Sequence, residues 1–210
     1  PNVLGVLFKE HEGSFLVGAL AAATTETKTV GFVGGMQNPV IERFEAGFKA
    51  GVWSVDSDIK ILTNYTGAFD DPGKGKTATD SMIRQKADVI FHAAGGTGLG
   101  MIEAAEEQGV WAIGVDSDQH HVAPTAVLNS MIKRVDVAVF DGTIMMLEPD
   151  FKAETISLGL QQNGVGLAPE ESNNATAEAT AVALEWADKI GSGEYVVPQF
   201  PKEVYEIFGK

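Results

Sequence analysis

Strand-like and helix-like segments alternate from residue 30 to residue 116 of this chain, and this alternation constrains the fold more than any other feature. The strand-like segments are continuous apolar runs, which are typical of parallel strands buried on both faces. The clearest helix begins at Asn38, which can cap it, and at Pro39, which suits its first position. The pattern predicts an α/β fold with a doubly wound parallel sheet. The expected strands are residues 3–8, 30–33, 59–65, 87–94 and 110–115, and the expected helices are residues 13–23, 39–52, 77–86 and 99–107.

Four loops follow the strands of this region, and in a parallel sheet they meet at one edge, where ligands bind. Met36 follows the first strand, Phe69 lies in the second loop, Gly95 and Gly96 lie in the third, and Asp116 ends the last strand. Glycines let backbone amides approach a ligand, an aromatic ring can stack on a planar base, and a carboxylate can accept from two sugar hydroxyls. Tight turns and a core phenylalanine would explain any single residue equally well. The prediction of a small-molecule site therefore depends on all four loops together.

The chain beyond residue 116 departs from this alternation. Asn129 or Ser130 is expected to open a long helix that reaches about Leu147. Lys133 and Arg134 would then lie in its first turn, where each cation opposes the helix dipole at a cost of roughly 0.3–1 kcal/mol. Either these are solvated surface charges, or Lys133 reaches into a cleft as a hydrogen-bond donor. A strand over residues 154–160, a helix over 175–190 and an extended tail over 193–201 are expected to follow.

Composition excludes several classes of function. The net charge is −14, from 29 acidic and 15 basic residues, which argues against nucleic acid as a partner and against binding to an anionic membrane through a basic patch. The chain has no cysteine, so disulfides and thiolate metal sites are excluded. No apolar run reaches the length of about 18 residues that a membrane-spanning helix needs.

Catalytic and metal sites are not indicated either. No nucleophile stands beside a base, so the sequence does not predict an enzyme. The clusters Glu10-His11-Glu12 and His120-His121 have no second cluster at metal-ligand spacing and are interpreted as solvated loop residues. His92 lies within an expected buried strand and is interpreted as a hydrogen-bonded core residue. No metal and no cofactor are expected.

A dinucleotide-binding enzyme is an alternative that the sequence leaves open. A strand, the glycine turn Gly96–Met101 and a helix are followed by Asp116, which is the context of a Rossmann fingerprint. Met101, however, stands where a third glycine or an alanine is expected, and the unit lies in mid-chain. A second alternative is the sensor domain of a transcriptional regulator.

Five segments carry a family resemblance, in order and over most of the chain: residues 8–15, residues 31–36 with 44–48, residues 88–98, residues 115–119 and residues 130–136. Together they resemble the basic membrane protein family of extracytoplasmic lipoproteins, the purine-nucleoside-receptor type of ABC-transporter substrate-binding protein. The resemblance implies a type I periplasmic-binding fold, in which two doubly wound lobes hold a nucleoside between them. It implies that Phe69 stacks on the base, that the backbone around Gly95 contacts the ligand, and that Asp116 and Lys133 hold the ribose hydroxyls. It also implies a non-catalytic receptor whose partners are a purine nucleoside and an ABC permease.

The resemblance also implies how the chain divides between lobes. Residues 1–8 would end the first lobe, 9–125 would form most of the second, 126–160 would return to the first, and 161–210 would complete the second lobe and form the tail. The opening part of the family's first lobe and its lipidated cysteine have no counterpart here. The chain is therefore expected to be the C-terminal two-thirds of a lipid-anchored extracytoplasmic receptor. We expect weak nucleoside binding or none by this chain alone, and a homodimer would cover its exposed cleft.

Overall fold

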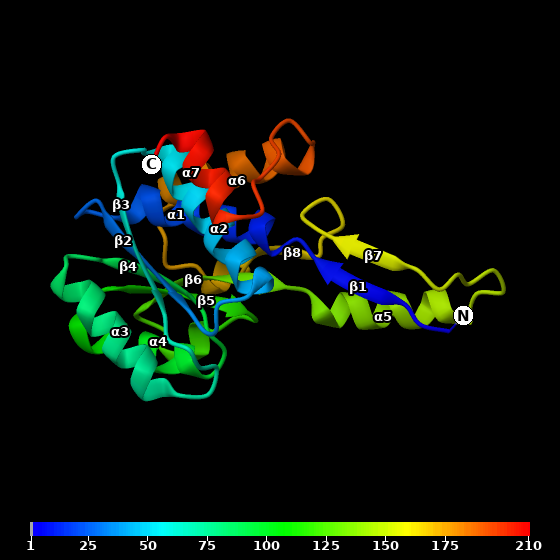
Figure 1. The fold of residues 1–210 in the computed structure, drawn as a ribbon, viewed down its shortest axis with the longest axis horizontal. Coiled ribbons are helices and arrows are strands. Elements are labelled where there is room, and N and C mark those ends of the chain that lie inside the picture. The colour runs from blue at the N-terminus through cyan, green and yellow to red at the C-terminus, as the bar shows by residue number, and fades with distance from the viewer. Residues whose placement is uncertain (1) are drawn as a thin grey trace.

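A computed structural model describes residues 2–210, in which a compact body carries a projecting arm (Figure 1). The body is built on a six-stranded sheet with the order β3-β2-β4-β5-β6-β8. All pairs are parallel except β6 with β8, which is antiparallel. The strands are β2 (Thr29–Gly34), β3 (Lys60–Tyr65), β4 (Val89–Ala93), β5 (Trp111–Asp116), β6 (Val127–Lys133) and β8 (Val165–Leu167).

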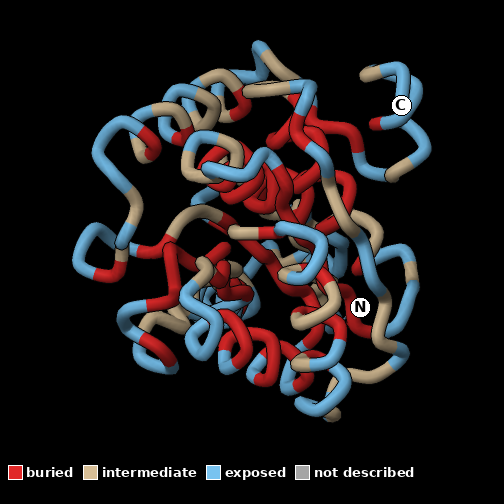
Figure 2. The backbone as a smooth tube through the Cα atoms, turned by 90° about the vertical axis from the view of Figure 1, so that its left-hand side faces the viewer, coloured by how far each residue is buried: buried red, intermediate tan, exposed pale blue. Residues whose placement is uncertain are grey.

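Helices cover both faces of this sheet, as Figure 1 shows. One layer consists of α1 (Glu10–Thr24), α2 (Pro39–Val55), α6 (Ala177–Gly191) and α7 (Pro201–Phe208), and the other of α3 (Pro72–Arg84) and α4 (Thr97–Gln108). Each layer packs on its own apolar core, and the central strands are buried from end to end. Figure 2 shows the buried residues gathered in the interior of the body, with exposed residues in the outer turns. Two short 3-10 helices, η1 (His120–Val122) and η2 (Glu170–Ser172), complete the body.

The order of the strands sets where a ligand can enter. From β2 the chain passes through α2 to β3 on one side, and from β3 it returns through α3 to β4 on the other side of β2. The loops after β2 and β4 therefore diverge to opposite faces of the sheet. Such a reversal leaves a crevice at the carboxyl ends of the two strands, and open α/β sheets bind ligands there. The predicted α/β fold with a doubly wound parallel sheet is confirmed.

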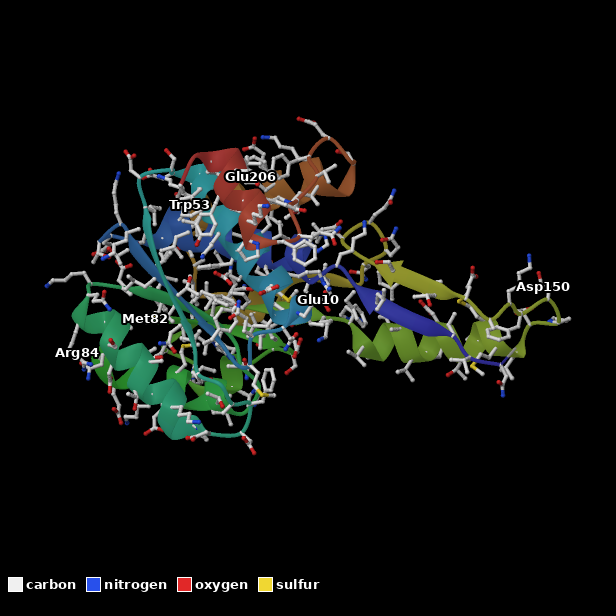
Figure 3. The ribbon with its side chains drawn as sticks, in the orientation of Figure 1. Glu10, Trp53, Met82, Arg84, Asp150 and Glu206 are labelled. Atoms are coloured by element: carbon white, nitrogen blue, oxygen red, sulfur yellow. The ribbon has the colours of Figure 1, made fainter. Side chains whose placement is uncertain are left out.

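The arm is a small unit of two strands and one helix. Strands β1 (Gly5–Phe8) and β7 (Thr155–Leu158) pair in parallel, and α5 (Val135–Leu147) lies beside them. Glu10 marks the base of the arm and Asp150 its tip (Figure 3). Helix α5 is apolar around most of its circumference but exposes large side chains to solvent, among them Phe140 at 67% and Leu147 at 76%. The arm thus has an apolar surface that the described residues do not cover.

The helix predicted from Asn129 or Ser130 is wrong at its start. Residues 127–133 form β6, and α5 begins at Val135. The side chain of Asn129 accepts a hydrogen bond from the Ala168 backbone N–H at 3.0 Å, so it joins β6 to the residue that follows β8 rather than capping a helix. Lys133 therefore ends a strand, and the helix-dipole argument does not apply to it.

The predicted division into lobes, with a boundary at residue 126, stays a prediction, and the structure shows where the chain passes from the body to the arm. Strand β6 pairs with β5 in the large sheet, so the chain leaves the body after Lys133 and the returning segment is residues 134–160. Residues 2–8 lie in the arm, and residue 1 lies outside the described part of the chain.

Three smaller differences have local causes. Helix α3 begins at Pro72 rather than Thr77, because the Asp71 side chain accepts from the Lys74 N–H and caps it. Strand β8 was not predicted, since it has only three residues. Helix α7 was not predicted either, because it follows directly on the proline-containing extended tail.

Candidate functional site

An ion pair between Asp116 and Lys133 lies at the carboxyl edge of the sheet. Asp116 is the last residue of β5 and Lys133 the last of the neighbouring β6, and Lys133 Nζ lies 2.8 Å from Asp116 Oδ1. Half of the Asp116 side chain is exposed (52%), whereas Lys133 is 20% exposed. A carboxylate that accepts and an ammonium that donates, held side by side, suit the two hydroxyls of a vicinal diol.

Two aromatic rings flank the lysine of this pair. The Lys133 ammonium lies 5.9 Å from the ring centroid of Phe8 and 5.8 Å from that of Phe44. Phe8 ends β1 in the arm and Phe44 lies on α2 in the body. Both distances fall within the range of cation–π attraction, which is worth about 0.5–1 kcal/mol at exposed sites. The rings therefore help to hold the ammonium beside Asp116.

Phe69 lies at the crevice between β2 and β4. A Cβ atom at Gly35 would lie only 2.2 Å from the Phe69 ring, so the missing side chain at Gly35 makes room for the ring. The Phe69 carbonyl accepts from the N–H of Thr97, the first residue of α4, at 3.2 Å. Phe69 is half-buried and packs against the larger apolar core. The loop thus fixes the ring between two strand ends while leaving part of it accessible.

The other predicted residues lie in the same crevice loops. Met36 follows β2 and is half-exposed. Gly95 has a φ of +54°, and Gly96 caps α4 without a side chain, so both leave backbone open to solvent after β4. The structure thus divides the predicted residues into two groups. Asp116 and Lys133 form a contact pair, and Met36, Phe69, Gly95 and Gly96 lie around the crevice of β2 and β4.

A cavity of about 750 Å³ opens beside the ion pair. It extends from Asp116 and Lys133 toward Gly166 on β8 and Asn163 before it, away from the Phe69 loop. Its volume falls in the range of small-molecule sites, roughly 300–1,000 Å³. The polar pair therefore has room for a ligand on this side.

The cluster Glu10-His11-Glu12 has a structural role at the base of the arm. Glu10 is buried and forms an ion pair with Arg43 of α2, whose Nε lies 2.8 Å from Glu10 Oε2. Glu12 pairs with Lys9 at 3.0 Å and accepts from the backbone N–H of Leu160. Burial lowers the pKa of His11 to about 4, so its imidazole is neutral at pH 7. Glu10 thus joins two helices of the body, and Glu12 joins the body to the end of the arm.

Metal and membrane-spanning features are lacking in the part of the chain that the structure describes. No group of three or more His, Cys, Asp or Glu side chains within residues 2–210 could hold a metal ion. No helix of that range is long and apolar enough to cross a bilayer.

Two glycines within the turn Gly96–Met101 serve helix packing. A Cβ at Gly98 would meet the His92 ring at 1.9 Å, and a Cβ at Gly100 would meet the Pro72 carbonyl at 1.8 Å. Met101, where the fingerprint needs a small residue, is fully buried in the α4 core. These glycines therefore face the protein interior instead of an open phosphate cradle.

Two residues of the site were missed in the sequence. Gln119 accepts from the backbone N–H of Val115 and from His92, and so supports the turn that carries Asp116. His92 is buried as expected, but it is not fully hydrogen-bonded, because its Nδ1 has no partner among the described residues. The segment Asp116-Ser-Asp-Gln119 was visible as part of a motif, but the contacts of its glutamine could not be read from spacing.

Comparison with known proteins identifies the family. The model of the family described as "ABC transporter substrate-binding protein PnrA-like" (Bmp) matches residues 1–200. The chain belongs to this family. Its members are substrate-binding proteins of ABC transporters, and the predicted family is confirmed.

Individual relatives agree with the family assignment. The chain is 41% identical over 217 residues to the "CD4+ T-cell-stimulating antigen" of Listeria monocytogenes, with 95% of this chain and 60% of the relative covered. It is 37% identical over 215 residues to the "ABC transporter nucleoside-binding protein BmpA" of Lactococcus lactis, with 94% and 60% covered. A solved ABC-transporter solute-binding protein from Aeropyrum pernix K1 superposes with a TM-score of 0.82 at 31% identity, over 99% of this chain and 70% of that one. The chain thus spans about 60% of the length of these curated relatives.

Proposed function

We propose that this chain is the ligand-binding part of an ABC-type nucleoside uptake system and that it captures purine nucleosides without catalysis. The observation that carries the proposal is the Asp116–Lys133 pair, which offers acceptor and donor atoms 2.8 Å apart at the open edge of the sheet. The half-buried ring of Phe69 at the neighbouring crevice suits a planar base. The relative from Lactococcus lactis is named as nucleoside-binding, which supports the same ligand class.

Ligand capture would work by closure of two lobes on the nucleoside. In this proposal the body is the second lobe and the arm, residues 2–8 and 134–160, belongs to the first lobe. The arm alone is a two-stranded unit with exposed apolar residues on α5, and the relatives extend beyond the matched region. A further part of the first lobe would supply the opposite wall of the site. A ligand can shift the lobes only by its higher affinity for the closed form.

The proposed partner is an ABC permease that recognises the closed form, and the proposed location is the outer side of the cell membrane, with a lipid anchor on the full-length protein. If the chain stands alone, the apolar surface of α5 would favour a homodimer. Binding by the chain alone would then be weak, because half of the site is contributed by the other lobe.

Calorimetric titration tests the proposal. Adenosine, guanosine, inosine, uridine and NAD are titrated into this chain and into a form that carries a complete first lobe. Saturable binding of purine nucleosides by the complete form, abolished in Asp116→Ala, is expected. Asp70→Ala is the matched control, because Asp70 is an exposed carboxylate in the Phe69 loop.

Other results would have clear consequences. If no nucleoside gives a binding signal in calorimetry while NAD binds, the receptor proposal is wrong and the dinucleotide-binding alternative is favoured. Nanomolar binding by this chain alone would contradict the proposal that a further lobe completes the site.

A further inference from the structure

The backbone at Asp116 is held in a conformation that side chains seldom adopt. Its φ is +65°, in the left-handed region that costs a non-glycine residue roughly 1–2 kcal/mol. The Ser117 N–H donates to the Val115 carbonyl two residues back, at 2.8 Å, which is the hydrogen bond of a γ-turn centred on Asp116. This turn directs the Asp116 side chain to Lys133. Strain of this kind persists only where surrounding contacts enforce it, and it is common at ligand sites.

The enforcing contact comes from Gln119. Its Oε1 accepts from the Val115 backbone N–H at 2.8 Å and lies 2.9 Å from His92 Nε2. The backbone N–H of Val115 can only donate, so the side-chain atom that it contacts must be the amide oxygen of Gln119. His92 Nε2 contacts the same oxygen and must therefore also be a donor. The last registered residue pair between β4 and β5 is Phe91–Ile113, so Val115 lies beyond the end of that ladder. Gln119 thus supplies the acceptor that the neighbouring strand no longer offers.

Gln119 is itself fixed from two sides. Its backbone N–H donates to Ser130 Oγ on β6 at 3.1 Å. Gly114 lies against it, and a Cβ at Gly114 would come within 2.9 Å of the Gln119 Cβ. The glutamine therefore lies folded beneath the strand end, in contact with β4, β5 and β6. Through Val115, the residue before Asp116, these contacts support the turn.

We propose that Gln119 is a positioning residue of the nucleoside site: it holds the strained turn that keeps the Asp116 carboxylate at Lys133, ready for the ligand hydroxyls. This inference rests on the proposed function, because it assigns Gln119 a role in that same site. Without the Gln119 acceptor, Asp116 relaxes toward extended backbone and the carboxylate leaves Lys133. Binding must then restore the turn, and a cost of roughly 1–2 kcal/mol lowers affinity by about 10-fold.

Two variants separate positioning from packing. Gln119→Leu keeps the size of the side chain but removes the acceptor, whereas Gln119→Glu keeps an oxygen that can accept from Val115 and His92. Gln108→Leu, at an exposed position at the end of α4, is the matched control. Each variant is titrated with adenosine, in the form with a complete first lobe. In this chain, amide hydrogen exchange at Val115 and a crystal structure of each variant report the turn without any ligand.

The proposal predicts faster exchange at Val115, a negative φ at Asp116, a broken Asp116–Lys133 pair and about 10-fold weaker binding for Gln119→Leu. It predicts recovery of the turn and of most of the affinity for Gln119→Glu, and no change for Gln108→Leu. The proposal would be overturned by a folded Gln119→Leu protein in which φ at Asp116 is still positive and the Asp116–Lys133 pair is intact. A folded Gln119→Glu protein that has lost the turn at Asp116 would also overturn it. If the wild type binds no nucleoside, the proposed function fails, but exchange and structure still decide whether Gln119 holds the turn.

Discussion

His92 should make the stability of the body fall steeply in mild acid. The side chain is fully buried on β4, and burial lowers its pKa from about 6.5 to about 4. The hydrogen bond to Gln119 and the charge of Asp116 oppose this effect but do not cancel it. The His92 Nδ1 atom, which would receive the proton, has no partner and faces Gly98 in the first turn of α4. The positive end of that helix dipole further disfavours a second positive charge there.

The sign and size of the effect follow from linkage. Folding favours the neutral imidazole, so the full stability is present above the unfolded pKa of about 6.5 and is lost as pH falls toward the folded pKa of about 4. For this one group the loss is about 2 kcal/mol at pH 5 and about 3 kcal/mol below pH 4. Carboxylates also titrate in this range, so the informative quantity is the difference between wild type and His92→Gln.

Urea unfolding followed by tryptophan fluorescence at pH 7.5 and pH 5 measures this difference. Between the two pH values, His92→Gln should lose about 2 kcal/mol less unfolding free energy than the wild type. His121→Gln, at an exposed histidine after β5, controls for removal of an imidazole. If the wild type and His92→Gln lose the same free energy, burial of His92 does not control its protonation and the reasoning is refuted.

Three further outcomes are expected. Phe69→Ala in the form with a complete first lobe should weaken purine nucleoside binding at least about 5-fold by calorimetry, because base–aromatic stacking is worth about 1–3 kcal/mol; unchanged affinity would place the base elsewhere. Lys49→Ala should lower the unfolding free energy by about 3–5 kcal/mol in urea, because it leaves the buried carboxylate of Glu45 without its counterion, with only the Tyr65 hydroxyl as a donor; a loss below about 1 kcal/mol would contradict this. Phe140→Ser with Leu147→Ser should reduce self-association of this chain in sedimentation experiments, since both side chains are exposed on the arm; an unchanged association state would exclude α5 as the contact.

The elements that could be predicted from sequence are mainly the buried strands of the sheet and the helices between them. The central strands β2, β4 and β5 are mostly apolar, and the alternation of strands and helices in the chain is enough to predict a doubly wound sheet. Strand β6 was not predicted, because Asn129 and Ser130 interrupt its apolar run and resemble helix caps. In the structure these two side chains bond to residues 168 and 119, which lie far from them in the chain or across a loop. Local sequence cannot distinguish a capping hydrogen bond from a long-range one.

The structure brings two of the predicted site residues into contact, and their part in ligand binding stays a prediction. Asp116 was chosen by its position at the end of a strand and Lys133 by the family resemblance, and the structure brings them into contact. The positive φ of Asp116 could not be predicted, because an aspartate adopts this conformation far less often than glycine does. The sequence also could not show that the ion pair lies apart from the Phe69 loop, because this depends on the order of the strands in the sheet.

The path of the chain at the base of the arm places the proposed ligand contact at Lys133 next to the junction between the body and the arm. Lys133 is the last residue of the body sheet, and Arg134, the next residue, donates its backbone N–H to the Gly164 carbonyl at 2.8 Å, where the chain re-enters the body. The residue whose ammonium pairs with Asp116 is thus separated from the first residue of the arm by one peptide bond. In the proposed lobe closure, a change in the angle of the arm would therefore also displace Lys133, and a ligand bound to this lysine would oppose that change.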